Sequence, residues 1–445
     1  MALHCKISGE IATHGIMGSR GVVYGPFPIW TYTALLHLTD DLVRLVQIRA
    51  ALVTMLTGLA IFWIAALCPA LRAPFGAIAF LSPYLFLYSR QLWDNTFLIP
   101  LSALTVAAYI SFCSKPSSWK LCLVSLGVTA MFLTHLMCAA LVVPLVAHLF
   151  AFHRAWLRER VAASMTAILI VAVLSVPYLL FVLSTPAASN VRLPDLSYLQ
   201  GWTFPFEGGR FFSAYGLDYF LGDDFFYRNA TPTALWILLF AEITWISIGV
   251  VWIGMAAAAR RVKKGFEPGG IQDVHFHLCL LSLGSLVAEC ALNGLTRTYH
   301  HPHYYNATWI FFLFFLWLAL SETKLPAAPI RSLKIACSLP LALVLGFLIL
   351  SIHKSGGNQN IHYGPCLQTQ IDVIRRMQSY SINSKVYINA GNLGRFPHSL
   401  QVIEEFYGWP SENRRTSNLP PTTLTIRPRG SPEEGWLTLE QALSD

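Results

Sequence analysis

The segment Ser89–Asn95 places a cation, an indole and a carboxylate between two apolar stretches. The guanidinium of Arg90 could bind a phosphate through two parallel hydrogen bonds. The carboxylate of Asp94, beside the ring of Trp93, could serve as a base or as a metal ligand. Ionisable groups near membrane depth are functional candidates by default, although anchoring at a membrane boundary would use the same residue types. This segment is therefore the leading candidate for a catalytic site.

Two other joints between apolar stretches carry aromatic and imidazole side chains. Tyr24 opens a Gly-Pro-Phe-Pro sequence that predicts a rigid entry into the membrane, with an aromatic-belt anchor as an equally good interpretation. The joint at 297–305 contains three histidines and ends in His303, Tyr304 and Tyr305. Its three imidazoles lack a standard metal-ligand spacing, so a structural or substrate-contacting role is favoured over a metal site.

Two further features are weaker candidates. His135 falls at a predicted outer turn between two apolar runs. The long loop 184–232 is crowded with aromatic and acidic side chains, and loops of this length in a compact bundle are usually functional or disordered. Such a surface could stack on a sugar or cover a lipid chain, and packing against the bundle is the alternative.

Composition excludes an ordinary soluble enzyme. Of the 445 residues, 55% are hydrophobic and 12% are charged, whereas a soluble domain carries about 25% charge. The formal net charge of +8 comes from basic residues in short loops between apolar runs, which indicates membrane topology and not a nucleic-acid partner. The nine cysteines form no CxxC pair, so the sequence predicts neither a disulfide framework nor a zinc site.

Long apolar runs predict an all-α polytopic membrane bundle. A bilayer core of about 30 Å needs about 20 apolar residues per helix, and runs this continuous argue against closed-barrel strands. We expect about ten to eleven spans, near residues 46–67, 75–88, 97–112, 121–133, 138–152, 161–183, 235–257, 276–292, 305–320 and 333–352. A further stretch, Phe27–Leu38, is too short to span comfortably and is expected at the interface.

Basic residues predict the orientation of these spans. Three loops rich in Lys and Arg are expected on the cytoplasmic side, at 153–160, 260–264 and 324–334. Parity then places the Arg90–Asn95 joint, the 297–305 joint, the loop 184–232 and the C-terminal segment on the opposite side. The expected location is the plasma membrane, with these parts extracytoplasmic.

The chain is expected to divide into three parts. Residues 1–26 are interpreted as the remnant of an outer first loop, residues 27–352 as the transmembrane domain, and residues 353–445 as a small soluble α/β appendage. The appendage contains an alternating stretch at 385–388, and residues 413–432 are expected to be loop or disordered. The N-terminal residues lack the pattern of a signal peptide, although parity places them outside. Either a first helix lies upstream of Met1, which is the favoured expectation, or Phe27–Leu38 crosses the membrane and puts Met1 inside.

In their order and spacing these motifs resemble the GT-C superfamily of membrane glycosyltransferases, especially the protein mannosyltransferase and lipid A aminoarabinose transferase branch. The resemblance covers most of the membrane portion. The motifs that carry it are the Tyr24–Pro28 entry, Ser82-Pro83 leading into Ser89–Asn95, Leu133–His135, and His303–Tyr305. It implies a GT-C-like bundle that transfers a sugar from a polyprenyl phosphate to an acceptor hydroxyl with inversion.

The resemblance also implies roles for individual residues. A carboxylate such as Asp94 would deprotonate the acceptor, and Arg90 would stabilise the departing phosphate. The first outer loop of the superfamily carries an aspartate, but Glu10 is the only acid before Gly25. Either Glu10 substitutes for that residue or the aspartate lies upstream of Met1. Metal use differs among the branches, so no metal ligand is assigned and the cofactor remains open.

Two alternatives remain beside the glycosyltransferase. A multi-span transporter or flippase for a lipid-linked or small polar substrate would also place polar groups among many spans, and a non-catalytic fragment would account for the missing acid. The glycosyltransferase interpretation implies a polyprenyl-phosphate-linked sugar, a lipid, glycan or protein acceptor and the lipid bilayer as partners, without nucleic acid. The concentration of polar and aromatic groups in outer joints, with no internal repeat, favours it over a transporter.

Overall fold

The computed structural model describes most of the apolar part of the chain and parts of its C-terminal segment. The described residues are 1–18, 22–68, 80, 82–185, 233–268, 273–296, 302–322, 341–350, 352–353, short pieces between 367 and 407 that include 385–389, then 421–428 and 437–443. The predicted outer loop 184–232, apart from its first two residues, and the predicted cytoplasmic loop 324–334 lie outside them. The chain forms two compact units, residues 1–213 with 243–342 and residues 214–242 with 343–445.

Five helical stretches in the described residues are long and apolar enough to cross a membrane. They are Leu42–Leu67, Asp94–Ser114, Leu136–Glu159, Val161–Ser184 and Val274–Leu295. Shorter apolar helices cover Ser118–Phe132, Trp309–Ala319 and Leu341–Leu350. These helices agree with the predicted helical membrane bundle, whereas its full number of spans stays a prediction.

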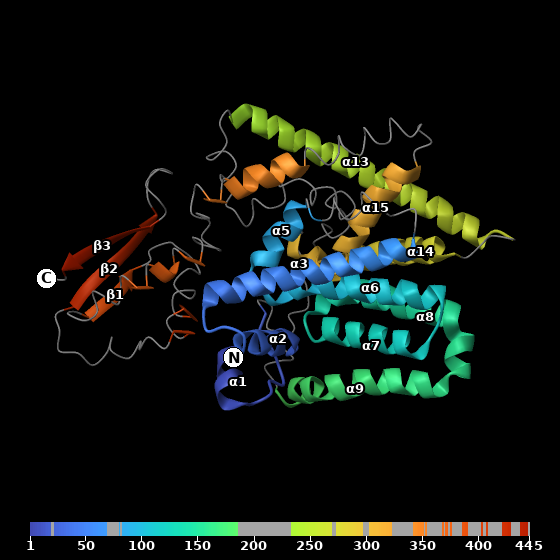
Figure 1. Cartoon of the computed structure of the whole chain (residues 1–445), viewed down its shortest axis with the longest axis horizontal. Helices are drawn as coiled ribbons and strands as arrows, with labels where there is room; N and C mark the ends of the chain where they lie inside the picture. The colour runs from blue at the N-terminus through green and yellow to red at the C-terminus, as the bar shows by residue number, and fades with distance from the viewer. Residues whose placement is uncertain are drawn as a thin grey trace. The chain divides into compact units, whose positions relative to one another are not determined.

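The first unit is built around helix α6 (Leu98–Ser114), which is buried along nearly its whole length. Helices α3 (Leu42–Leu67) and α7 (Ser118–Phe132) pack against α6, and α9 (Val161–Ser184) packs on α7, so these four helices lie side by side (Figure 1). Gly127 lets α7 approach closely, because a Cβ there would lie 2.2 Å from Thr105 Oγ1 of α6.

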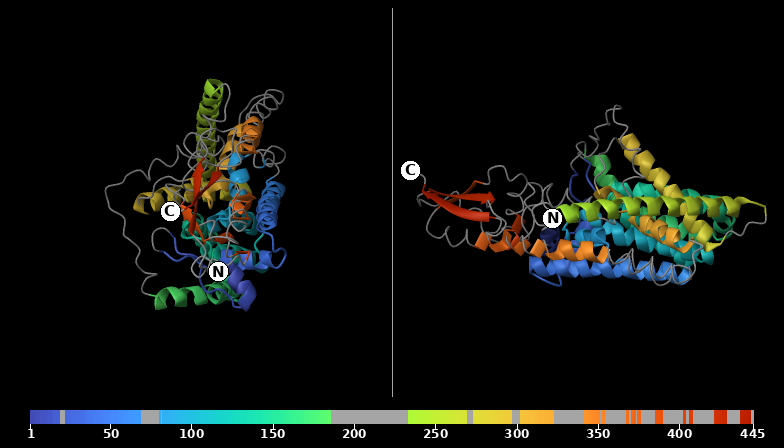
Figure 2. Two further views of the ribbon diagram at one scale, coloured as in Figure 1. Left: turned by 90° about the vertical axis from the view of Figure 1, so that its left-hand side faces the viewer. Right: turned by 90° about the horizontal axis from the view of Figure 1, so that it is seen from above.

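A second pair of helices completes this packing. Helix α8 (Ala139–Glu159) packs along α14 (Val274–Thr296), and α14 also contacts α6. Helix α15 (Trp309–Glu322) contacts α6 as well, and the backbone of its Phe315 lies against Gly254 of α13 (Thr233–Phe266). The views in Figure 2 show the long helices of this unit running side by side. The polar joints therefore gather at the two ends of a helical bundle.

Helix α13 extends beyond the predicted span 235–257. The basic segment Arg260–Lys264 is predicted as a loop, but the helix continues through it to Phe266. Lys, Arg and Ala are strong helix formers, and Lys263 and Lys264 lie in the last turn, where positive charge is favoured by the helix dipole. The basic residues thus extend an apolar helix instead of ending it.

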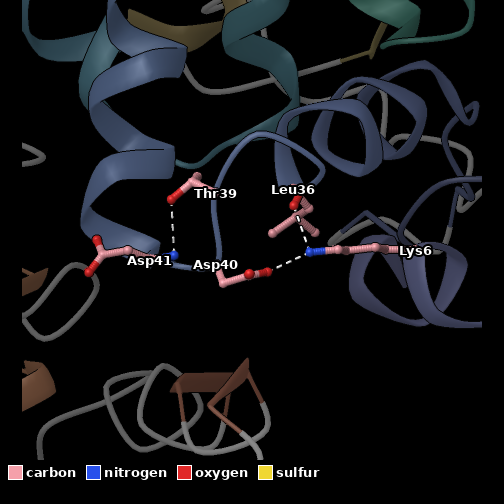
Figure 3. A network of polar contacts seen from close by, with 5 residues as sticks. All are labelled: Lys6, Leu36, Thr39, Asp40 and Asp41. Atoms are coloured by element: carbon pink, nitrogen blue, oxygen red, sulfur yellow. Dashed lines mark hydrogen bonds and ion pairs between the residues drawn. The ribbon is translucent and has the colours of Figure 1, made fainter.

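The N-terminal segment forms two short helices, α1 (Ala2–Ser8) and α2 (Phe27–Leu36). Lys6 of α1 donates to Leu36 O at 2.7 Å and pairs with Asp40 at 2.5 Å, which fastens α1 to the turn after α2 (Figure 3). Asp41 then caps α3, since its carboxylate accepts from Arg44 N at 2.7 Å. At 10 residues α2 is too short to span a bilayer, as predicted for Phe27–Leu38.

The predicted span 75–88 lies partly outside the described residues, and the predicted span 305–320 appears as a shorter helix. Helix α5 covers Pro83–Arg90, and residues 69–79 lie outside the described part. The second region begins with the 3-10 helix η8 (Pro302–Tyr305), followed by α15. The end of α5 and the helix η8 thus each supply one side of a buried polar joint, which is described below.

The second unit contains a three-stranded sheet. Strand β1 (Lys385–Asn389) pairs in parallel with β2 (Pro421–Pro428), and β2 pairs antiparallel with β3 (Leu437–Leu443). The alternating stretch at 385–388 falls on β1. Residues 413–432 are predicted as loop or disordered, whereas the structure has β2 there, because Thr422–Ile426 is rich in β-branched residues that favour a strand. That this unit is soluble stays a prediction.

Candidate functional site

The entry around Tyr24 folds back on itself before it reaches α2. Gly15 N donates to Tyr24 O at 2.7 Å and Tyr24 N donates to Ile16 O at 3.0 Å. Gly25 lies directly on the turn after α7, where a Cβ would lie 2.5 Å from Leu133 Cα. Phe27 N also donates to Leu133 O at 3.2 Å. The structure thus joins two motifs, the Tyr24 entry and the Leu133–His135 turn, that are more than one hundred residues apart in the sequence.

His135 is buried against the entry. Its ring lies 4.2 Å from the ring of Tyr24, and its Nδ1 accepts from Met137 N at 3.2 Å, capping the 3-10 helix η3 (Leu136–Cys138). Burial lowers the pKa of His135 to about 4, so the imidazole is neutral at neutral pH. With Nδ1 occupied as an acceptor, Nε2–H is the group left to donate a hydrogen bond.

Helix α9 holds the same entry from another side. The hydroxyl of Tyr178 donates to Val23 O at 2.7 Å, in a buried contact. His14 stacks on Phe181 with 3.8 Å between ring centroids. Contacts with the turn after α7 and with α9 therefore hold the entry in place, so its conformation does not depend on its local sequence alone.

A second junction joins the Ser89–Asn95 segment to the joint that ends at Tyr305. The rings of Trp93 and His303 lie 4.4 Å apart. Asn306 donates to Asn95 O at 3.2 Å, and its side-chain oxygen accepts from the hydroxyl of Tyr84. All members except the partly exposed Trp93 are buried. The two outer joints predicted from the sequence therefore meet in one hydrogen-bonded and aromatic cluster.

Tyr304 and Tyr305 have different surroundings within this cluster. The ring of Tyr304 lies 4.2 Å from the ring of His303. Tyr305 is almost fully buried, with its ring 6.3 Å from that of Phe312. Tyr304 thus belongs to the aromatic surface shared with Trp93, whereas Tyr305 is part of the packing beneath it.

Asp94 is buried at the start of the 3-10 helix η2 (Asp94–Phe97), which leads directly into α6. Its Oδ1 accepts from Asn95 N at 2.8 Å. Its Oδ2 is buried and accepts no hydrogen bond from any residue that the structure describes. Native proteins rarely leave a buried carboxylate oxygen without a partner. A hydroxyl proton or a cation from a substrate would satisfy this atom.

Arg49 is a functional candidate that the sequence analysis missed. It lies in α3 with no exposed surface, donating from Nη1 to Ser89 O at 2.8 Å and from Nη2 to Trp93 O at 3.4 Å. Its guanidinium also lies 4.9 Å from the ring centroid of Phe97. Arg49 therefore clamps both ends of the segment that carries Arg90. Its signal in the sequence was a single arginine inside an apolar run.

Tyr32 of α2 connects the two charges electrostatically. Burial raises the pKa of Tyr32 to about 12, with Arg49 acting to lower it and Asp94 acting to raise it. The rings of Tyr32 and Phe97 are 5.3 Å apart, and that of Phe27 is 6.4 Å from Phe97. Because Phe27 also bonds to the turn after α7, the two junctions belong to one end of the bundle.

The remaining predicted site residues lie apart from Asp94. Arg90 is exposed and folds back over its own helix, donating to Phe86 O at 2.9 Å with its guanidinium 3.8 Å from the Phe86 ring centroid. Glu10 is exposed near α1, with its carboxylate 3.4 Å from His4 Nε2. No hydrogen bond or ion pair joins either residue to Asp94 in the described part of the chain. Their predicted roles as phosphate ligand and substitute acid stay predictions.

A second buried carboxyl, Glu289 of α14, was also missed. Its two oxygens accept from Asn293 at 3.1 Å and from Thr308 at 3.2 Å. Glu289 has no exposed surface, and it acts electrostatically on Tyr84, a member of the Asn306 cluster. An acid within a predicted span was the available signal.

This end of the bundle thus combines a carboxylate oxygen that lacks a partner, a buried guanidinium, and the rings of Trp93, His303 and Tyr304. Such a set can accept a proton, balance negative charge and stack on a ring-shaped substrate. Comparison with protein-family models, with curated proteins and with solved structures finds no match to this chain.

Proposed function

We propose that this protein is a membrane glycosyltransferase. It transfers a sugar from a polyprenyl phosphate to an acceptor hydroxyl, with inversion, at the non-cytoplasmic face of the plasma membrane. The GT-C resemblance supplies the reaction class. The observation that supports it best is the buried Asp94 Oδ2, which has no partner among the described residues.

In the proposed reaction Asp94 is the base. Its Oδ2 takes the proton of the acceptor hydroxyl while the hydroxyl oxygen bonds to the anomeric carbon. The bond between that carbon and the phosphate oxygen breaks, and polyprenyl phosphate leaves as an anion. The polyprenyl chain stays in the bilayer beside the apolar helices, whereas the sugar lies against the rings of Trp93 and His303.

Two cations support the departing phosphate in different ways. Arg90 is exposed at this joint and can turn its planar guanidinium to the phosphate. Arg49 donates from both terminal nitrogens to the carbonyl groups of Ser89 and Trp93, so it positions the segment and contributes a fixed positive charge. Glu10 has no role in this reaction, because Asp94 alone takes up the proton of the acceptor hydroxyl.

The test measures the leaving group, which is the same for every donor sugar. The purified chain in lipid nanodiscs is supplied with a panel of hexosyl and pentosyl polyprenyl phosphates and with cell-envelope extracts as acceptor. We expect release of polyprenyl phosphate by the wild type and at least a hundredfold loss in Asp94→Asn, the size of effect typical for a general base. Asp40→Asn, an exposed acid outside the site, is the matched control. Equal release by Asp94→Asn and wild type would eliminate this function.

A transporter is the second candidate, and one observation favours it specifically. Glu289 is a fully buried carboxyl within an apolar helix, the kind of group that marks substrate and ion pathways in membranes. A fluorescent lipid-linked sugar in proteoliposomes would then cross the bilayer without releasing polyprenyl phosphate, and Glu289→Gln would stop the movement. Crossing that depends on Glu289, with no phosphate release, would replace the glycosyltransferase by a flippase.

A further inference from the structure

A cluster of metal-binding side chains lies where three helices meet, away from the junctions of Asp94 and His135. Cys113 is in the last turn of α6, His148 is in α8, and His277 is in the first turns of α14. One ligand atom from each lies within 4.8 Å of the others. The two imidazoles are buried and the thiol is partly buried. No residue of this cluster takes part in the proposed sugar transfer.

The distance between the two imidazoles fits a shared ion. Nδ1 of His277 lies 3.2 Å from Nε2 of His148. With Zn–N bonds of about 2.0–2.1 Å, two nitrogens on a tetrahedral zinc ion are about 3.3 Å apart. Without an ion the same distance is that of a hydrogen bond between two neutral rings, so the spacing alone does not decide between them.

A second observation favours the ion. Nδ1 of His148, the nitrogen that faces away from His277, lies 2.7 Å from the hydroxyl of Tyr109. Histidines that bind a metal through one nitrogen almost always bond to an outer partner through the other. Tyr109 of α6 therefore orients one of the three candidate ligands, His148.

The surroundings contain a candidate fourth ligand, outside the group of three close ligand atoms, and an apolar wall. His153, on the same helix as His148, has its ring 6.0 Å from that of His277, and its Nε2 is buried without a hydrogen-bond partner in the described residues. The rings of Phe152 and Phe276 pack on His277 at 5.5 Å and 5.3 Å. Such a wall excludes competing water from the ligands, which tunes metal affinity.

We propose that Cys113, His148 and His277, with His153 as the fourth ligand, form a structural zinc site that staples α6, α8 and α14 together. Imidazole and thiolate in a tetrahedral set suit Zn²⁺. On binding, the Cys113 thiol gives its proton to water and the imidazoles stay neutral, so one proton is released per ion. This site is independent of the sugar transfer, because no ligand lies in the Asp94 or His135 junctions.

The experiment uses the full chain, purified in detergent, freed of metal by chelation and titrated with Co²⁺ and then with Zn²⁺. We expect one equivalent of Co²⁺ to give a near-ultraviolet thiolate charge-transfer band, which Zn²⁺ removes. Cys113→Ser abolishes the band, and His148→Gln and His277→Gln each weaken Zn²⁺ binding at least tenfold. Tyr109→Phe weakens it about 10–100-fold, as for other second-layer partners. Cys122→Ser and His37→Gln, outside the cluster, bind like the wild type.

Two results would overturn the proposal. A chain that binds less than one equivalent of Co²⁺ has a hydrogen-bonded histidine pair only. A band that persists in Cys113→Ser assigns the metal to another cysteine. Elution volume and thermal midpoint of each metal-free variant, compared with the metal-free wild type, separate loss of ligands from loss of fold. Sugar transfer by Asp94→Asn plays no part in either readout, so the two proposals succeed or fail separately.

Discussion

Asp94 and Arg49 are opposite charges buried at the same end of the bundle, and each is satisfied differently. In the described part of the chain neither forms an ion pair. Arg49 donates to two carbonyl groups, whereas Asp94 keeps one oxygen without a hydrogen bond. Burying a charge is costly unless hydrogen bonds compensate it. The two terminal nitrogens of Arg49 are thus compensated within the protein, although its Nε has no partner among the described residues. Asp94 Oδ2 is left to be compensated by what binds.

Replacing Arg49 by Met tests its role as a clamp. The change removes the Arg49 donor from Ser89 O, and a buried polar group left unpaired costs about 1–3 kcal/mol. Trp93 O loses only its long bond and keeps the Thr96 hydroxyl as a donor at 2.6 Å. We expect a lower thermal midpoint, followed by tryptophan fluorescence in detergent, and weaker sugar transfer because the segment loosens. Arg44→Met, exposed on the same helix, should leave both unchanged. Equal midpoints for the two variants would show that Arg49 does not hold the segment.

At the scale of elements, close backbone contacts decide how the N-terminal entry and the bundle fit together. The entry reaches the turn after α7 only because Gly25 has no side chain. In the same way, Gly127 brings α7 against α6. Both glycines are needed for contact between elements and not for unusual backbone angles.

Gly25→Ala should therefore separate the entry from the turn. A Cβ would lie 2.5 Å from Leu133 Cα and from Leu133 O, and overpacking of this kind costs about 1–3 kcal/mol. We expect a lower thermal midpoint and faster proteolysis of the N-terminal segment, with the zinc affinity unchanged. Gly249→Ala, where a Cβ meets nothing within 4 Å, should be neutral or stabilising because alanine favours a helix. Similar losses in both variants would contradict the contact.

The sequence predicted the helices better than it predicted which elements contact one another. Apolar run length was enough to predict a helical membrane bundle, of which five described helices are long enough to span, because spanning a bilayer requires a fixed length of apolar residues. Proline and aromatic residues correctly indicated that Tyr24, Trp93 and His303 lie in segments that connect apolar helices. The pairs that these joints form could not be predicted, since Trp93 and His303 are separated by more than two hundred residues.

Ionisable residues inside apolar runs were the missed signal. Arg49 and Glu289 lie in runs that were counted only as spans, although each is an intramembrane charge in the sequence. The zinc ligands are a different case, because Cys113, His148 and His277 have no spacing that marks a metal site. Only the packing of α6, α8 and α14 brings them together.

At the scale of the whole molecule, two groups of polar contacts occupy opposite ends of the first unit. The Asp94 and His135 junctions are formed by the start of α6, the end of α7 and the end of α9. The zinc ligands are carried by the end of α6, the later half of α8 and the start of α14. The Arg90–Asn95 joint and the 297–305 joint, which the positions of Lys and Arg predict on the same side of the membrane, thus lie at the same end of the bundle. Which end faces outward stays a prediction.

Cysteine labelling in cells tests that orientation. Leu92→Cys and Glu159→Cys place thiols at exposed positions, the first at the Asp94 end and the second at the end of α8. A membrane-impermeant thiol reagent applied from outside should label Leu92→Cys, and should label Glu159→Cys only after the membrane is permeabilised. The parent chain gives the background from native cysteines. Labelling in the reverse order would invert the topology and move the proposed reaction to the cytoplasmic face.

The burial of α6 has a consequence for how the protein is made. One flank of this helix is covered by α14, which begins at Val274, 160 residues after α6 ends at Ser114. At about 5–20 residues per second, synthesis of that interval takes on the order of ten to thirty seconds. During this time the ribosome-bound chain holds a central helix with an uncovered side. Assembly of the bundle must therefore wait for a late segment, and the nascent chain needs shelter at the insertion machinery until that segment arrives.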